Sequence, residues 1–435
     1  MDNISDIRHE LKHLYYLSKV LCLAPFSFSW NPVAREIFIN TSLSSNVTGF
    51  IWTLFMSIIM VTGLISGIIR YKHVGHSNPG VALNNSFCFP MNFINALLSF
   101  VVLFMNRFKF GELVQKLSEI DDKLCQIKLR RCTKYQNYFL YFAYTVCALL
   151  LMFMCYDILE VEERRYFVYS IVYRIAYFIS LVLIIQFCHI VRCIEERLIV
   201  LERGVSSVLE NRTPIGVTST LTLPSVETVD KSELLSITSL ISENENQVEP
   251  IENSLLFSRK ALPHRKSYQL HIIITSRKIY SDIYDATQLI NSVYGFILLL
   301  LFIRAAAGLV TNIYHLASIT ISGYVFVEYK NWGTAGHISS LVTWIVIFLS
   351  TITMMTVTCQ MTILKSKKIG DIIQKLILQQ PLRSDMLQQL KLFSDQVAKS
   401  EIKFSAFWFF NVDMSLLYTM LTSVTTYIIV LMQAK

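Results

Sequence analysis

Long apolar stretches alternate with polar segments along the 435-residue chain, and this pattern predicts membrane-spanning helices. An α-helix needs about 20 mostly apolar residues to cross a bilayer. The second stretch is the weakest candidate, because Pro90, Asn92 and Asn95 interrupt it. Seven stretches have the required length, at residues 49–69, 87–105, 138–158, 168–191, 289–313, 338–361 and 409–433. The sequence therefore predicts an all-α membrane protein with seven transmembrane helices.

Composition supports the same class. Apolar residues make up 53% of the chain and the mean hydropathy is +0.47, values that soluble domains rarely reach. Residues 1–45 mix charged and apolar residues and lack the apolar core and cleavage site of a signal peptide. We therefore expect the first span to serve as its own insertion signal.

The distribution of basic residues predicts the orientation. Lys and Arg concentrate in cytoplasmic loops of membrane proteins, and long loops follow this rule poorly. With the long 192–288 loop left out, one set of alternating segments holds 20 Lys and Arg residues and the other holds 6. The N-terminus is therefore expected in the cytoplasm and the C-terminus outside. A G-protein-coupled receptor has the opposite orientation, and the net charge of +8 arises from these loops, so it requires no nucleic-acid partner.

Two kinds of cytoplasmic segment are expected. Residues 107–136, 268–290 and 369–398 have an apolar period close to 3.6, so they predict helices that continue the spans and pack into an anchor domain. Residues 204–262 are rich in Ser, Thr, Glu and Asn without a sustained apolar period, which is typical of a disordered insertion. The predicted organisation is a cytoplasmic N-terminal segment (1–48), spans one to four (49–203), the disordered insertion (204–262), spans five and six (263–368), anchor helices (369–408) and a pore-lining seventh helix (409–433).

Charged residues inside spans are the first candidates for a ligand site, because charge in a membrane is costly and is usually functional. Asp157, Arg174 and Arg304 lie in the third, fourth and fifth spans. They are expected in the outer half of the membrane, where two interpretations stay open. They form ion pairs that fix helix packing, or they line a water-filled pocket that holds a polar ligand.

Aromatic residues are expected at the same depth. Tyr169, Tyr173 and Tyr177 follow one another at a spacing of four, so they form a stripe on one helix face. Many such residues are only interface anchors. Beside acidic and imidazole groups, however, a stripe of phenols suits a polyhydroxylated ligand, whose C–H faces contact rings and whose hydroxyls form hydrogen bonds. The candidate ligand-binding residues are Asp157, Tyr173, Arg174, Tyr177, Glu328, Tyr329, His337 and Trp344.

The seventh span carries many hydroxyl residues. Such residues either tighten helix contacts or line water. In a monomer this face would point inward, whereas in an oligomer it would surround a central pore, with Gln433 at the outer end. The candidate pore and gate residues are Thr422, Thr426, Tyr427, Leu431 and Gln433.

The chain offers no sign of catalysis. It contains no Walker or Gly-x-Gly-x-x-Gly sequence, no catalytic triad pattern, and no C-x-x-C spacing for a metal among its nine cysteines. We therefore expect a protein that is not an enzyme and that has no cofactor.

The chain ends in Thr426-Tyr427-Ile428-Ile429-Val430-Leu431-Met432-Gln433, which resembles the TYhhhhhQ signature of insect gustatory receptors, where h is apolar. Residues 16–26 (YLSKVLCLAPF), 326–328 (FVE) and 341–345 (LVTWI) resemble the fructose-receptor branch of that family. The resemblance extends over nearly the whole chain.

The resemblance implies a ligand-gated, non-selective cation channel that conducts Na⁺, K⁺ and Ca²⁺ in the plasma membrane of a sensory neuron. It implies a homotetramer, or a hetero-oligomer with other gustatory receptors, in which four seventh helices form the pore and Gln433 lies at the gate. Glu328 and Trp344 match positions expected to line a sugar pocket, with D-fructose as the first candidate ligand. The alternative is a seven-span chemoreceptor for a polyol, amino acid or bitter compound that needs a co-receptor or does not itself conduct.

Overall fold

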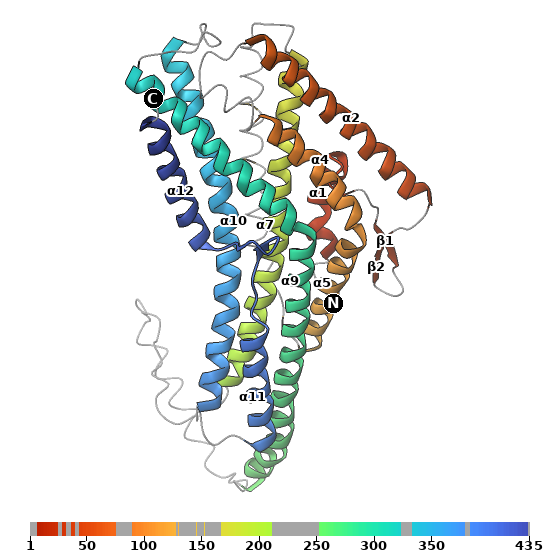
Figure 1. Cartoon of the computed structure of the whole chain (residues 1–435). Coiled ribbons are helices and arrows are strands. Elements are labelled where there is room, and N and C mark those ends of the chain that lie inside the picture. Colours follow the sequence, from red (N-terminus) through yellow and green to blue (C-terminus); the bar gives the residue numbers. More distant parts are fainter. Residues whose placement is uncertain are drawn as a thin grey trace, which may run out of the picture.

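The computed structural model describes residues 7–24, 28–31, 36–39, 43–74, 89–127, 129, 145, 152, 167–210, 252–322, 333–378 and 383–433. In this part of the chain the fold is a bundle of long helices (Figure 1). The helices are α1 (Ile7–Val20), α2 (Leu43–Val74), α4 (Phe89–Met105), α5 (Arg107–Gln126), α7 (Phe167–Glu210), α9 (Glu252–Ser322), α10 (Gly333–Leu378), α11 (Ser384–Lys399) and α12 (Met414–Gln433).

Two short antiparallel hairpins interrupt the helical fold, and the sequence did not predict either of them. Strand β1 (Phe28–Asn31) pairs with β2 (Glu36–Ile39) near the N-terminus. Strand β3 (Ser405–Ala406) pairs with β4 (Phe410–Asn411) immediately before α12. Each strand has only two to four residues, so no alternating apolar pattern was long enough to indicate it.

Helices long and apolar enough to cross a membrane are found at most of the expected spans. In the described residues there are five, or up to six if the bent pair α4 and α5 counts as one span. These helices contain the spans expected at 49–69, 168–191, 289–313 and 338–361, and α4 contains most of 87–105. The expected third span, at 138–158, lies outside the described residues apart from two isolated positions.

The polar residues that interrupt the second span face the protein interior. Pro90 is the second residue of α4, where a helix tolerates the missing N–H of proline. Asn92 and Asn95 are buried, and the Asn95 amide donates to the Ser180 hydroxyl of α7 over 3.1 Å. Asn95 therefore joins α4 to α7.

The predicted start of the seventh span at residue 409 is wrong, because α12 begins only at Met414. The carboxylate of Asp413 accepts hydrogen bonds from the backbone N–H groups of Ser415 (3.0 Å) and Leu416 (3.2 Å). A side chain in this position caps a helix N-terminus. The residues just before it turn back on themselves in the β3–β4 hairpin, so the chain enters the helix five residues later than the apolar pattern suggested.

The lower half of Figure 1 is a second bundle, formed by α5, α11 and the lower parts of α7, α9 and α10; we call it the lower bundle. Helix α5 contributes an apolar face at the expected helical period, formed by Phe110, Leu113, Val114, Leu117, Ile120 and Leu124. Phe108, at the start of the helix, does not belong to this face, because its side chain is 56% exposed, whereas that of Phe110 is buried.

Ion pairs join the helices of the lower bundle. The guanidinium of Arg197 on α7 is fully buried and lies 2.7 Å from the Asp121 carboxylate on α5. Two lysines of α5, Lys116 and Lys123, pair with carboxylates of α9. Lys368 of α10 lies 2.6 Å from Glu202 of α7. The amphipathic segments predicted as anchor helices therefore do pack together.

Helices α7 and α9 also reach into both ends of the predicted insertion, at Glu210 and Glu252, so its boundaries at 204 and 262 are too wide.

Candidate functional site

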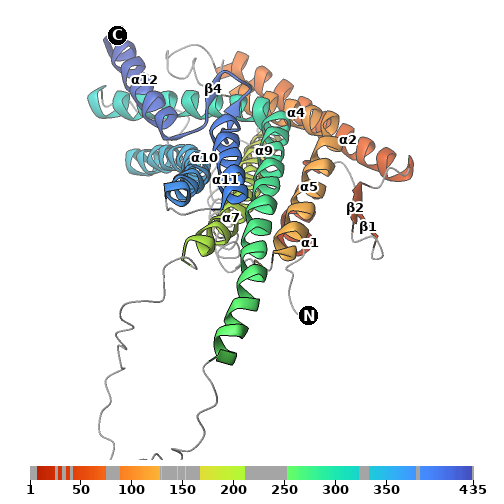
Figure 2. The same cartoon turned by 90° about the horizontal axis from the view of Figure 1, so that it is seen from below.

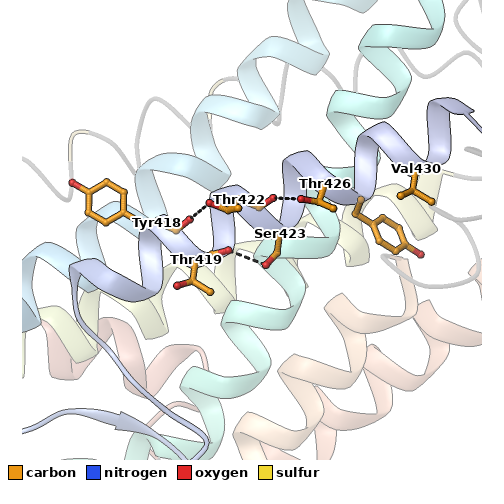
Figure 3. A pocket seen from close by; sticks show the side chains of 7 residues that line it. Tyr418, Thr419, Thr422, Ser423, Thr426 and Val430 are labelled. Carbon is orange, nitrogen blue, oxygen red and sulfur yellow. Dashed lines mark hydrogen bonds between the residues drawn. The ribbon is translucent and has the colours of Figure 1, made fainter.

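Helix α12 exposes one continuous face to a hollow at the side of the helical bundle (Figure 3). Its lining residues repeat at spacings of three and four, and they are Tyr418, Thr419, Thr422, Ser423, Thr426, Tyr427 and Val430. Only Leu417 and Val424 of this helix are buried against the rest of the chain. Most of α12 is therefore free to face something other than its own bundle.

The hydroxyl groups on this face bond within their own helix. Thr422 donates to the Tyr418 carbonyl over 2.9 Å, and Thr426 donates to the Thr422 carbonyl over 3.0 Å. Ser423 donates in the same way to Thr419 over 2.8 Å (Figure 3). Because each proton is already used, each hydroxyl oxygen presents its acceptor lone pairs outward. The face therefore offers a row of oxygen acceptors without any charged residue.

Three of the five predicted gate residues line this hollow, namely Thr422, Thr426 and Tyr427. Leu431 and Gln433 lie in the last turn of α12, beyond the lining residues, and Gln433 is exposed. The list of candidate pore and gate residues did not include Tyr418, Thr419, Ser423 or Val430, which also line the hollow. Their spacing of three or four from the predicted residues was the signal that could have identified them.

A second candidate region lies inside the bundle, where three helices surround one buried cation. The guanidinium carbon of Arg304 on α9 lies 4.5 Å from the centre of the Tyr177 ring on α7 and 5.7 Å from the Phe348 ring on α10. The Tyr177 ring meets the Trp344 ring edge-on, with centroids 4.9 Å apart. We call Tyr177, Arg304, Trp344 and Phe348 the arginine–aromatic cluster.

The surroundings of Arg304 are unusual for a charged side chain. It is only 6% exposed, and none of the residues that the structure describes forms an ion pair with it. Its Nε atom is buried without a hydrogen-bond acceptor. Stacking on aromatic faces compensates part of this burial, since a desolvated cation–π contact contributes about 2 kcal/mol. The rest of the cost makes Arg304 a candidate for contact with a ligand.

A close approach of α9 and α10 fixes this geometry. At Gly308, one turn beyond Arg304, an added Cβ would lie 2.4 Å from the Phe348 ring. The absence of a side chain at Gly308 therefore lets the two helices bring Phe348 over the guanidinium. Phe348 was not among the predicted site residues, although it follows Trp344 by one helical turn.

The structure brings some of the predicted ligand residues together. Tyr173 lies one turn before Tyr177 on α7, half-buried, with its ring 6.1 Å from that of Tyr169 and 6.2 Å from that of Phe93 on α4. The tyrosine stripe therefore leads into the arginine–aromatic cluster. Arg174 is half-buried on the same helix. Asp157, Glu328 and Tyr329 lie outside the described residues, as does the side chain of His337, so the pairing predicted between Asp157 and the two arginines stays a prediction.

The β3–β4 hairpin connects α9 to the start of α12. Asn291 of α9 donates to the Lys403 carbonyl over 2.8 Å and accepts from the Ser405 N–H over 3.1 Å. At Gly295 an added Cβ would lie 3.1 Å from the backbone nitrogen of Phe407. The hairpin is therefore held directly against the helix that carries Arg304.

Two lysines and one glutamate form ion pairs at the base of this hairpin. Lys403 lies 2.7 Å and Lys367 lies 3.7 Å from the Glu401 carboxylate. The hydrogen bond from Lys403 is the main reason why the pKa of Glu401 is below its usual value, and Lys367 acts in the same direction. The two lysines beside the hairpin are thus paired with a carboxylate of their own chain.

At the tip of the hairpin, two aromatic residues adopt a left-handed backbone. The φ angles are 51° at Phe407 and 65° at Trp408. Bulky residues are rare in this region, and each such residue costs of the order of 1–3 kcal/mol. The surrounding structure must hold this turn in place.

A family model described as "7tm Chemosensory receptor" matches residues 11–435. The chain belongs to this family. The match extends over α12 and its hydroxyl face as well as the arginine–aromatic cluster, so both candidate regions lie within the receptor fold. The family assignment also agrees with the expectation that the chain is a multi-pass membrane protein and not an enzyme. No curated protein sequence matches the receptor at a significant level.

Two solved structures have a similar fold. The insect olfactory receptor OR5 from Machilis hrabei superimposes with a TM-score of 0.63 at 11% identity, covering 99% of this chain and 100% of that one. The same olfactory receptor in complex with eugenol gives a TM-score of 0.60 at 11% identity, with the same coverage. The receptor therefore has the seven-span fold of that protein. The fructose-receptor branch inferred from sequence stays a prediction.

Proposed function

We propose that the receptor is a ligand-gated, non-selective cation channel of the sensory-neuron plasma membrane, opened by a small polar tastant. The observation that carries this proposal is the exposed hydroxyl face of α12. A helix that is apolar enough to span a membrane gains nothing by turning a row of hydroxyls toward lipid. Around a central water-filled path the same row of hydroxyls faces water, and four copies of α12 in a homotetramer would surround that path.

The chemistry of this face suits cations. The lining residues Thr419, Thr422, Ser423 and Thr426 present oxygen acceptors, and α12 contains no charged residue from Met414 to Gln433. Oxygen dipoles stabilise a passing cation, whereas a ring of fixed charge or a tight cage would be needed to select strongly among cations. The expected permeant ions are therefore Na⁺, K⁺ and Ca²⁺. The gate is expected in the last turns of the helix, at Tyr427, Leu431 and Gln433.

The ligand is proposed to reach the arginine–aromatic cluster. Aromatic rings at Tyr173, Tyr177 and Trp344 suit the C–H faces of a sugar or polyol. The guanidinium of Arg304 can donate hydrogen bonds to ligand oxygens, and its Nε atom has no acceptor in the described structure. A sugar such as D-fructose is the first candidate, as the sequence resemblance suggests. An amino acid or a bitter compound is the alternative.

A physical path exists between the two regions. Phe302 lies two residues before Arg304 on α9, and its ring is 5.8 Å from that of Phe410 in β4. Phe410 is four residues before the start of α12. A ligand that shifts α9 at Arg304 therefore acts on the base of the proposed pore helix through one aromatic contact.

Whole-cell current in cells that express this chain alone tests the proposal. The cells are exposed to a panel of sugars and polyols that includes D-fructose, and surface labelling confirms delivery to the membrane. We expect a fast inward cation current to at least one ligand, and altered gating in Gln433→Ala. Surface-expressed receptor that gives no ligand-evoked current to the panel, alone or with a second receptor, would contradict the channel assignment.

A further inference from the structure

The turn between β3 and β4 presents three consecutive aromatic side chains to the surface. Phe407, Trp408 and Phe409 are 50%, 81% and 73% exposed, respectively. We call them the aromatic tip. Single exposed apolar residues are common, whereas a contiguous group of large ones marks a contact surface. The aromatic tip is therefore a candidate contact surface.

The backbone of the tip supports a role for these side chains. Phe407 and Trp408 both have positive φ angles, which a glycine would adopt without strain. A turn that only had to reverse the chain would be easier to form with glycine. Strain of this kind is a reason to look for function in the side chains that are retained.

The tip is rigid before it meets any partner. Its base is fixed to α9 by the two hydrogen bonds of Asn291, and the Phe407 ring contacts the Phe296 ring of α9 edge-on at 5.4 Å. Phe407 and Phe409 stack on each other at 6.3 Å. A surface that is already ordered loses little conformational entropy on binding.

The position of the tip indicates what covers it. Phe409 is five residues from the start of α12, a distance that an extended chain spans in about 17 Å. Seen from below, the hairpin lies beside α9 on the side of the bundle where α12 also lies (Figure 2). Copies of the chain that gather around their α12 helices therefore bring this segment close to a neighbouring copy.

Charge also favours a protein partner over lipid headgroups. The lysines at the base of the hairpin, Lys367 and Lys403, are already paired with Glu401, so neither offers an unpaired charge to anionic lipids. An apolar surface with internally balanced charges is typical of a contact between subunits.

We propose that the aromatic tip packs against a second copy of this chain and holds the base of α12 at the subunit interface. This inference rests on the proposed function, because it requires α12 to assemble around a common path. It adds a specific contact outside the pore-lining residues, and it explains why the strained turn keeps its aromatic side chains.

Chemical cross-linking tests the position of the tip. In a Cys125→Ser background, Phe409→Cys is labelled with benzophenone maleimide in native membranes and irradiated, so that one thiol is enough to link the tip to the surface that covers it. Met105→Cys, at a side chain that is 74% exposed, is the matched control. We expect covalent dimers from Phe409→Cys and fewer than one tenth as many from Met105→Cys. Equal or absent cross-linking at residue 409 would overturn the proposal.

A glycine substitution separates a contact between subunits from a local structural role. Trp408→Gly removes the ring and relieves the backbone strain, so the fold of the single chain should keep or raise its melting temperature. Association of subunits, measured by mass photometry on dilution, should weaken at least tenfold. Unchanged association would reject the proposal. Quenching of Trp408 emission by brominated lipids in the assembled receptor would also reject it, because such quenching would place the tip in the membrane.

The two proposals fail in different ways. Ligand-evoked current combined with unchanged assembly of Trp408→Gly would reject the subunit contact and leave the channel assignment intact. Cross-linked dimers without any ligand-evoked current would reject the channel and leave the contact between copies intact.

Discussion

Phe302 on α9 and Phe410 in β4 meet edge-on, with ring centroids 5.8 Å apart and an angle of 78° between the planes. The pair joins the helix that carries the buried Arg304 to the strand that leads into α12. It is therefore a direct contact between the interior of the bundle and the segment that precedes the exposed hydroxyl face.

Phe302→Leu should uncouple ligand binding from opening. The substitution keeps an apolar side chain in the bundle and removes the ring contact, which contributes about 0.5–1.5 kcal/mol. We expect about a twofold to tenfold rise in the ligand concentration for half-maximal current, with ligand binding to the purified receptor unchanged. A parallel loss of binding would show that Phe302 belongs to the ligand site itself.

Arg304→Lys should weaken the response to ligand. Lysine keeps the charge but loses the planar group that stacks on Tyr177 and Phe348 and the several donors that it holds in place. A loss of about 1–2 kcal/mol corresponds to a weakening of roughly fivefold to thirtyfold in ligand affinity. Thermal stabilisation of the purified receptor by ligand measures this effect. Tyr177→Phe, which keeps the ring under the guanidinium, serves as the control and should retain most of the affinity.

Thr426→Val should reduce cation conductance without unfolding the helix. Valine has nearly the same shape as threonine but lacks the oxygen that faces the hollow. Thr425→Val is the matched control, because Thr425 also bonds to a carbonyl one turn earlier, at Leu421, but does not line the hollow. Single-channel recording should show a lower conductance in Thr426→Val only. An equal effect of both variants would argue against the assigned pore face.

Gly295→Val should detach the hairpin from α9. Any Cβ at residue 295 meets the backbone of Phe407 at 3.1 Å, and backbone atoms cannot move aside as a flexible side chain can. Overpacking of this kind costs about 1–3 kcal/mol, so the melting temperature should fall by several degrees. Gly370→Val provides the comparison, because the Cβ at residue 370 meets only a Val397 methyl group, at 3.4 Å. A larger loss of stability at residue 370 would contradict this prediction.

Asp121→Asn should destabilise the lower bundle strongly. It leaves the fully buried Arg197 guanidinium without the carboxylate that lies 2.7 Å away. Removal of one partner of a buried ion pair typically costs about 3–5 kcal/mol. Fluorescence-detected size-exclusion chromatography should show little folded receptor. The double variant Asp121→Leu/Arg197→Met removes both charges and should recover much of the folded fraction. Wild-type behaviour of Asp121→Asn would show that the pair does not stabilise the bundle.

The sequence by itself determined the class of fold. A bilayer requires long apolar helices whose backbone groups bond internally, so hydropathy alone marked the spans that the structure contains in α2, α4, α7, α9, α10 and α12. Helical periodicity likewise predicted most of the buried face of α5. The hydroxyl content and the terminal motif of the last span pointed to Thr422, Thr426 and Tyr427, which line one hollow. These properties depend on residues close together in the chain.

Only the tertiary structure decided which distant residues meet. The stacking of Arg304 on Tyr177, the buried pair of Arg197 and Asp121, and the contact of Phe302 with Phe410 each join segments more than 70 residues apart. The β3–β4 hairpin was hidden in the same way, because its two-residue strands carry no pattern and its conformation depends on the space left by Gly295 on α9. Local patterns fix where helices form, whereas the packing between helices fixes which side chains act together.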